Sequence, residues 1–390
     1  MNHARPQISD AQRRAALVTR HLLTPPARAA TAEQVADALL ALHATDPSSV
    51  YLSVAARTAA PSPADLERAL YDERTLLRML SMRRTMFVVP RALAPVVDAS
   101  TARAVAARER KNLQKVLDEQ LGHDARWFAA TERDVLAALT ALGEATAAQI
   151  ADAVPALKGQ ITMAPGKPYE TRPRITSRFL GVMAAEGRIR RGRPLGTWAS
   201  SQFRWTVAEP HPELPADDAK ADLAARYLGA FGPATTEDLK WWTGWTVTDT
   251  RKALARTPAV AVDLASGPGH ALPDDLDLPD DAAPGAALLP GLDPTPMGWR
   301  GRDWYLDPAH TPELFDTNGN VGPTVWWSGR VVGGWAQRPD GEVVVSLLTD
   351  PGREARAAVD AEVARLTDYF DDIRVRPSFR TPLERRLYEG

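Results

Sequence analysis

A short segment that occurs twice constrains the fold of this chain more than any other feature. Residues 142–150 read LGEATAAQI and residues 231–239 read FGPATTEDL, and each copy follows an amphipathic run. In each copy a glycine precedes a threonine that suits the N-cap of a following helix, Thr146 or Thr235. A helix, a turn and a capped second helix begin a helix-turn-helix. A looser third copy lies at residues 15–35, so we predict three modules of this DNA-binding type in tandem.

The bulk composition is that of a globular protein without a membrane span. Of 390 residues, 44% are hydrophobic and 25% are charged, and no run of about 18 apolar residues occurs. The N-terminus lacks the apolar stretch of a signal peptide, which favours a cytoplasmic location, with nucleoid association when DNA is bound. Without cysteine the chain has no disulfide, no thiolate nucleophile and no Cys-ligated metal.

Positive charge is concentrated in one segment, although the formal net charge is −2. Residues 167–193 contain eight Lys or Arg and two Glu, and they end in the pattern of a hairpin tip, with Trp198 and Trp205 on the way back. Fixed cations on a hairpin tip suit phosphate contacts in a DNA groove, although a solvated basic surface without a partner is the simpler alternative. The arginines that we predict to bind DNA here are Arg178, Arg188, Arg190, Arg191 and Arg193.

The pattern along the chain predicts four units in an α+β fold. Three tandem winged-helix (helix-turn-helix) modules are followed by a small C-terminal β-barrel. The first module, 1–125, ends in a polar linker helix, and the second, 126–210, holds the basic hairpin. The third, 211–284, ends in a linker rich in Pro, Asp and Gly that begins at residue 267. Short strands separated by turns then occupy 285–390, with one amphipathic helix towards the end.

The turn 43–46, with the sequence His-Ala-Thr-Asp, joins two apolar helical segments. Asp46 followed by Pro47 has the pattern of a helix cap, which is a purely structural interpretation. His43 ends an apolar helix face, where no such reason accounts for it, so it is a candidate catalytic residue. The seven histidines show no metal-ligand spacing and no glycine-rich phosphate loop follows a strand, so we expect neither a metal nor a cofactor.

Tryptophans cluster at residues 241–245, where two interpretations are open. In the first interpretation, the tryptophans stack on exposed bases and belong to a DNA-binding surface. Aromatic residues at helical spacing more often face the core, and we expect this of Trp241, Trp242 and Trp245.

Several segments together resemble the AlkZ-like winged-helix DNA glycosylases over nearly the whole chain. Residues 42–57 are similar to the family's active-site segment, and residues 82–85 (Met-Arg-Arg-Thr) to its arginine-bearing wing strand. Residues 287–293 and 323–333 are similar to its C-terminal barrel motifs. The resemblance implies a C-shaped protein that wraps double-stranded DNA, excises alkylated bases and repairs crosslinks formed by genotoxic natural products. It also implies DNA contacts by Arg57, Arg83 and Arg84.

The active-site motif differs from that of the family. Family members carry Gln-x-Gln or Gln-x-Asp where this chain has His43, Ala44 and Thr45. Hydrolysis of an N-glycosidic bond passes through a cation-like state and needs a positioned water. We expect neutral His43, with an ordinary pKa near 6.5, to accept the proton of that water. Thr45 is then expected to orient the water and Asp46 to supply negative charge.

The sequence therefore predicts a monofunctional DNA glycosylase that acts on alkylated or bulky-adduct purines. Residues 43–57 contain no lysine to form a Schiff base, which argues against a lyase. Two alternatives remain: a non-catalytic DNA-binding protein, as regulator or lesion-recognition factor, and a scaffold for protein interactions. Because tandem modules supply the repeated contacts that other winged-helix proteins gain by dimerising, we expect a monomer.

Overall fold

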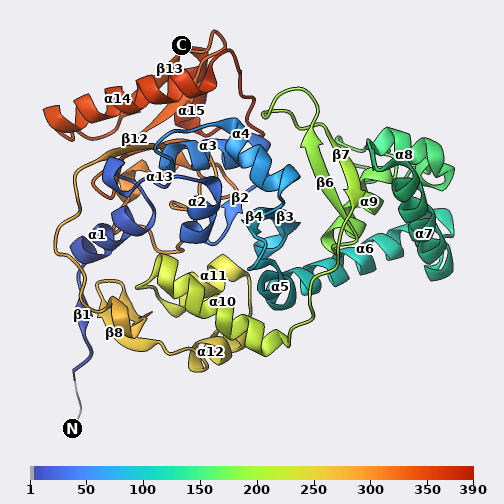
Figure 1. The fold of residues 1–390 in the computed structure, drawn as a ribbon, viewed down its shortest axis with the longest axis horizontal. Coiled ribbons are helices and arrows are strands. Elements are labelled where there is room, and N and C mark those ends of the chain that lie inside the picture. Colours follow the sequence, from blue (N-terminus) through green and yellow to red (C-terminus); the bar gives the residue numbers. More distant parts are fainter. Residues whose placement is uncertain (1–3) are drawn as a thin grey trace.

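The computed structural model describes residues 4–390 and has a mixed α+β fold (Figure 1). Four small sheets divide the chain into successive units, three with three-stranded sheets and the last with a four-stranded sheet. Residues 4–390 contain no helix that is long and apolar enough to cross a membrane.

The first unit is built on an antiparallel sheet with the strand order β2-β4-β3. The helix α1 precedes it, and α5 leads out of it towards the long helix α6. Its elements are α1 (Asp10–Arg20), α2 (Ala32–Leu39), β2 (Leu42–His43), α3 (Pro47–Arg57), α4 (Pro63–Glu67), β3 (Leu76–Leu80), β4 (Met86–Pro90) and α5 (Ala94–Val97).

The second unit repeats this arrangement with the strand order β5-β7-β6. The predicted basic hairpin is formed by β6 and β7, and the helix α9 precedes it. The elements are α6 (Arg103–Leu121), α7 (Ala125–Leu142), β5 (Glu144–Ala145), α8 (Ala147–Ala153), α9 (Thr176–Ala185), β6 (Ile189–Pro194) and β7 (Phe203–Val207).

The third unit has the strand order β1-β8-β9, in which the N-terminal β1 runs parallel to β8. Ala234 forms an antiparallel bridge with His270 of β9. The linker expected from residue 267 is wrong at its start, because residues 267–271 pair with β8 as a hairpin strand. The elements are β1 (Gln7–Ile8), α10 (Ala216–Phe231), α11 (Thr236–Thr243), α12 (Val247–Ala255), β8 (Val260–Leu264) and β9 (Gly267–Ala271).

The second and third units share one order of elements: a helix, a short strand or bridge, two helices, and a hairpin whose last strand lies beside the first. In the first unit the short strand β2 follows two helices, α1 and α2, and it too lies beside the last strand, β4. The predicted caps are confirmed. Thr146 accepts the Gln149 N–H at 3.3 Å and Thr235 accepts the Asp238 N–H at 3.1 Å, each within a capping box. In the looser copy Thr31 caps α2 in the same way. Local cap chemistry therefore fixes the start of the second helix in every unit.

The fourth unit is an antiparallel sheet with the order β10-β11-β12-β13. Across residues 4–390 no pairing joins β10 to β13, so the sheet is open where the sequence predicts a barrel. Helices cover it instead, with α14 against β10 and α15 against β12. The elements are β10 (Ala286–Leu289), α13 (Thr311–Leu314), β11 (Thr324–Trp327), β12 (Arg330–Gln337), β13 (Val343–Leu347), α14 (Arg353–Phe370) and α15 (Pro382–Glu389).

The second unit has a hydrophobic core of its own, centred on Phe128 and Phe179, and stands as a lobe to one side (Figure 1). The other units share their cores. One core joins Phe231 and Trp242 of the third unit to Trp299 of the fourth. The expectation that the tryptophan cluster packs in the core is thus confirmed for Trp242, whereas Trp241 is only partly buried against that core. The chain consequently forms a main body and one lobe, with α6 running between them.

Candidate functional site

The candidate catalytic turn begins in the short strand β2. His43 pairs with Phe87 of β4, and the two rings meet edge to face with their centroids 5.1 Å apart. The Ala44 N–H donates to the Met86 carbonyl at 2.8 Å, which continues the pairing by one residue. His43 is 4% exposed, and its Nδ1 is buried without a hydrogen-bond partner among the described residues. The sheet therefore fixes the backbone of His43, and its imidazole packs against Phe87 without a hydrogen bond to another described residue.

Burial lowers the pKa of His43 to about 3, and the positive charge of Arg83 adds to the shift, while Asp293 opposes it. The imidazole is therefore neutral at physiological pH. This corrects the expectation of an ordinary pKa near 6.5. A neutral imidazole with so low a pKa accepts a hydrogen bond from water but does not retain the proton.

The other two polar residues of the turn, Thr45 and Asp46, differ in how far they are exposed to solvent. Thr45 is exposed, whereas Asp46 is 5% exposed and forms the N-cap of α3. One Asp46 oxygen accepts from the Ser48 N–H at 3.0 Å and from its hydroxyl at 2.6 Å, and the other accepts from the Ser378 N–H at 2.9 Å. The structure thus favours the cap interpretation of Asp46, since both carboxylate oxygens are already used.

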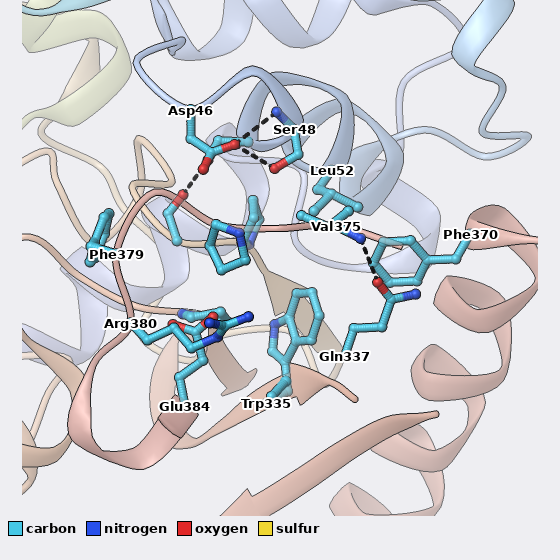
Figure 2. A pocket seen from close by; sticks show the side chains of 16 residues that line it. Asp46, Ser48, Leu52, Trp335, Gln337, Phe370, Val375, Phe379, Arg380 and Glu384 are labelled. Atoms are coloured by element: carbon cyan, nitrogen blue, oxygen red, sulfur yellow. Dashed lines mark hydrogen bonds between the residues drawn. The ribbon is translucent and has the colours of Figure 1, made fainter. Parts of the chain in front are cut away.

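Asp46 faces a cavity, shown in Figure 2, that lies between α3 and the C-terminal unit. Trp335 and Phe370 form apolar walls, and Arg380 and Glu384 lie opposite Asp46. Burial raises the pKa of Glu384 to about 7. The cavity has a volume of about 40 Å³, which suits a few water molecules and is too small for a purine.

Arg57 is fully buried, which contradicts its prediction as a DNA contact. Its guanidinium forms a two-pronged ion pair with Asp293, with N–O distances of 2.8 and 2.6 Å. The remaining donors go to the carbonyls of His21 and Ser53 and to the Thr295 hydroxyl. Arg57 therefore ties α3 to the fourth unit and has no donor left for a phosphate.

The arginines of the first-unit wing have different environments. Arg84 is exposed and pairs with Glu109, with Nε 2.6 Å from a carboxylate oxygen. Arg83 is half-buried, and its guanidinium carbon lies 4.0 Å from the ring centroid of Trp241. Both have left-handed backbone conformations, with φ of 51° and 63°, which non-glycine residues adopt sparingly.

Two arginines of the basic hairpin are held by carboxylates. Arg188 lies 2.8 Å from Glu132 within the lobe. Arg193 reaches across to the main body, where it pairs with Glu67 and Asp72, each at 2.7 Å. These contacts explain how the lobe is fixed to the first unit, and they leave these two guanidinium groups less available to DNA than the sequence suggests.

The unpaired cations line a cleft between the lobe and the main body. Two adjoining cavities, of about 420 and 340 Å³, lie between β3 on one side and α9 and β6 on the other. Arg78, Arg190 and Arg191 line both cavities, and none of them forms an ion pair within residues 4–390. We call this region the basic cleft. Arg84 and Arg178 line one of its two cavities.

The arginines of the basic cleft are partly buried and lack a balancing anion among the described residues. Burial and the nearby charge of Arg78 lower the pKa of Arg191 to about 10, and its guanidinium lies over the ring of Phe203 at 4.3 Å. Burial also lowers the pKa of Arg190. Nε of Arg190, like Nε and Nη2 of Arg78, is buried without a partner in the described chain. Unpaired guanidinium groups at such sites are suited to phosphate.

The comparisons with known proteins agree on one family. The family model described as DNA glycosylase AlkZ-like matches residues 36–369. The chain belongs to this family. The interstrand DNA cross-link repair glycosylase of Streptomyces sahachiroi is 31% identical over 160 residues, which are 38% of this chain and 42% of that protein. The solved structure of Streptomyces sahachiroi DNA glycosylase AlkZ has the same fold, with a TM-score of 0.70, 22% identity, and coverage of 93% of this chain and 97% of that one.

Arg78 of this AlkZ-like chain is the cleft residue that the sequence does not reveal. It is a single cation within the apolar strand β3, Leu-Leu-Arg-Met-Leu, and nothing in that pattern distinguishes it from a solvated residue on the exposed face. Its position next to Arg190 and Arg191 depends on how the lobe docks on the main body. An isolated Arg in an edge strand is the only available signal, and it is a weak one.

Proposed function

We propose that the protein is a monofunctional DNA glycosylase that hydrolyses the N-glycosidic bond of alkylated or bulky-adduct purines in double-stranded DNA. The strongest support is the neutral, buried His43 imidazole next to exposed Thr45, at the position where the resemblance implies the family's glutamine motif. A neutral imidazole, like a neutral amide, offers an acceptor for the hydrogen of an attacking water. The family membership of the chain supplies the reaction class.

DNA binding is assigned to the basic cleft and to the units beside it. The shared order of helices and hairpin supports three winged helices, with boundaries near residues 125, 210 and 284. In the second of them, β6 and β7 form the wing. The unpaired Arg78, Arg190 and Arg191 are placed to contact backbone phosphates, because a fixed guanidinium binds two phosphate oxygens at once.

The proposed reaction needs little acid or base strength. When the purine is cationic, the bond between its nitrogen and C1′ breaks with the electron pair moving to the base. A water then bonds to C1′ and its proton passes to solvent. Neutral His43 accepts a hydrogen bond from this water, and Thr45 orients it with its hydroxyl. Asp46 holds the turn in place as the cap of α3.

A bulky or crosslinked adduct is the preferred substrate class in this proposal. The partial relative from Streptomyces sahachiroi is named as an interstrand DNA cross-link repair glycosylase. The cavity that Asp46 lines has a volume of about 40 Å³, which is too small to enclose a purine. In this proposal the enzyme serves the repair of, or self-resistance to, damage by genotoxic natural products.

Base release tests the reaction directly. A duplex with one N7-methylguanine and a second duplex with a bulky N7 adduct are incubated with the protein, and abasic sites are converted to strand breaks by alkali. We expect breaks with wild type and none above background with His43→Ala, at an unchanged DNA affinity. Tight binding without breaks on either duplex would instead identify a non-catalytic lesion-recognition protein.

Salt dependence tests the cleft. Arg190→Ala with Arg191→Ala should weaken binding to every DNA sequence alike and reduce the slope of log affinity against log salt by about one per lost phosphate contact. Arg353→Ala, at an exposed position outside the cleft, is the matched control and should leave the slope unchanged. An unchanged slope in the double variant would show that DNA does not enter the cleft.

A further inference from the structure

Two guanidinium groups share one tryptophan at the meeting point of three units. The Arg83 guanidinium carbon lies 4.0 Å from the ring centroid of Trp241, and that of Arg302 lies 5.0 Å from the same ring. Arg302 also lies 4.9 Å from the ring of Phe315, and its Nε donates to the Pro296 carbonyl at 3.1 Å. The first, third and fourth units thus fix two cations against one indole.

The pairing of β2 with β4 brings this group next to the catalytic turn. The two strands are antiparallel, so the chain that leaves β2 at Thr45 passes the turn Met82–Arg84 that leads into β4. The hydrogen bond from the Ala44 N–H to the Met86 carbonyl confirms this register. The charge of Arg83 is, moreover, strong enough at His43 to contribute to its lowered pKa.

No anion balances these two cations. Neither Arg83 nor Arg302 forms an ion pair within residues 4–390, although neighbouring Arg84 does. Nε of Arg83 is buried without a partner, and burial together with the charge of Arg302 lowers the pKa of Arg83 to about 10. Arg83 is also held at a φ of 51°, a costly conformation that persists only where the surroundings enforce it. Like charges held together with free donors form a site for an anion.

We propose that Arg83 and Arg302 jointly bind one backbone phosphate of DNA, beside the nucleotide whose base is excised. This site rests on the proposed function. It adds Arg302 as a DNA-binding residue and identifies which negative charge stabilises the sugar cation. The sugar becomes positive as the glycosidic bond breaks, neutral His43 does not offset that charge, and the Asp46 oxygens are occupied. A phosphate held here brings negative charge close to the sugar, so the substrate itself supplies what the turn lacks.

A phosphate-by-phosphate binding experiment tests the site without relying on any variant. Duplexes with one N7-methylguanine carry a neutral methylphosphonate at one position at a time on either side of the lesion. Wild type should lose about tenfold in affinity at one flanking position, the cost expected for charge-assisted hydrogen bonds to one phosphate. A series in which every flanking position behaves alike would overturn the proposal.

The variant Arg302→Gln identifies the residue. It should bind the unmodified duplex about tenfold more weakly, with a salt slope lower by about one, and should show no further loss at the sensitive position. Arg300→Gln, at an exposed position two residues away, is the matched control and should behave as wild type. Urea unfolding of both variants shows that they are folded, and Arg302→Lys, which keeps the charge, should recover the salt slope.

The outcomes separate this site from the proposed function. If Arg302→Gln binds as wild type and still loses affinity at the sensitive position, another residue holds that phosphate and the site is overturned. If wild type binds no duplex at all, DNA binding itself is wrong, and the loss is then independent of Arg302. Dependence on Arg190 and Arg191 without dependence on Arg302 retains the cleft and removes only this site.

Discussion

Acidifying the reaction from pH 8 to pH 5 should leave the rate of base excision almost unchanged. In the proposed reaction His43 acts as the neutral imidazole, and burial together with the charge of Arg83 lowers its pKa to about 3. At pH 5 only about 1% of such an imidazole is protonated. With an ordinary pKa near 6.5, about 97% would be protonated at that pH and the rate would fall about 30-fold. The two cases are therefore easy to distinguish.

The assay is single-turnover excision from an N7-methylguanine duplex, with enzyme in excess and at saturating concentration, so that changes in affinity do not enter. Depurination without enzyme is subtracted at each pH. His43→Gln is the matched control, because its amide does not titrate and is the residue type that the resemblance implies for the family at this position. A fall of about tenfold or more in wild type between pH 7 and pH 5, absent from His43→Gln, would refute the burial argument.

Three further outcomes follow from the buried groups and the tandem units. The pKa of His21, like that of His43, is lowered to about 3, so the stability of the fold is full above about pH 6.5 and declines as the pH falls towards 3. At pH 5 each of the two histidines should lower the free energy of unfolding by about 2 kcal/mol. Equal urea midpoints at pH 7 and pH 5 would contradict this. Arg57→Met should lower the free energy of unfolding by about 3–5 kcal/mol, and adding Asp293→Leu should restore much of it; an additive loss in the double variant would show that the two side chains are not coupled. Light scattering at micromolar concentration should show a monomer, and a stable dimer would count against tandem modules as the source of repeated contacts.

Features set by near neighbours in the sequence are predictable here. Thr146 and Thr235 cap their helices as expected, because the cap bond joins residues three apart and needs no tertiary contact. The recurrence of one local pattern therefore locates the starts of α8 and α11.

Features set by distant partners are not predictable from one sequence. Arg57 and Arg193 have the pattern of exposed basic residues, yet their carboxylate partners are 236 and 126 residues away. Nothing in the sequence around Arg78 or Arg302 marks a binding site, and only the docking of units places Arg78 beside Arg190 and Arg191, and Arg302 beside Arg83. The C-terminal sheet fails in the same way, since strand spacing does not reveal whether the first and last strands pair or a helix such as α14 covers the edge.

A substitution of Asp46 distinguishes a structural role as helix cap from a catalytic role at the sugar. One of its oxygens receives the Ser48 N–H and hydroxyl, and the other receives the Ser378 N–H, so both need to be acceptors. Asp46→Asn keeps a single acceptor and turns an amide donor towards one of these donors, which should cost about 1–3 kcal/mol of unfolding free energy in urea. The single-turnover rate of the folded variant should stay within about twofold of wild type, because the carboxylate contacts the protein and not the sugar. Unchanged stability with a rate loss of about tenfold or more would show instead that Asp46 stabilises the sugar cation directly.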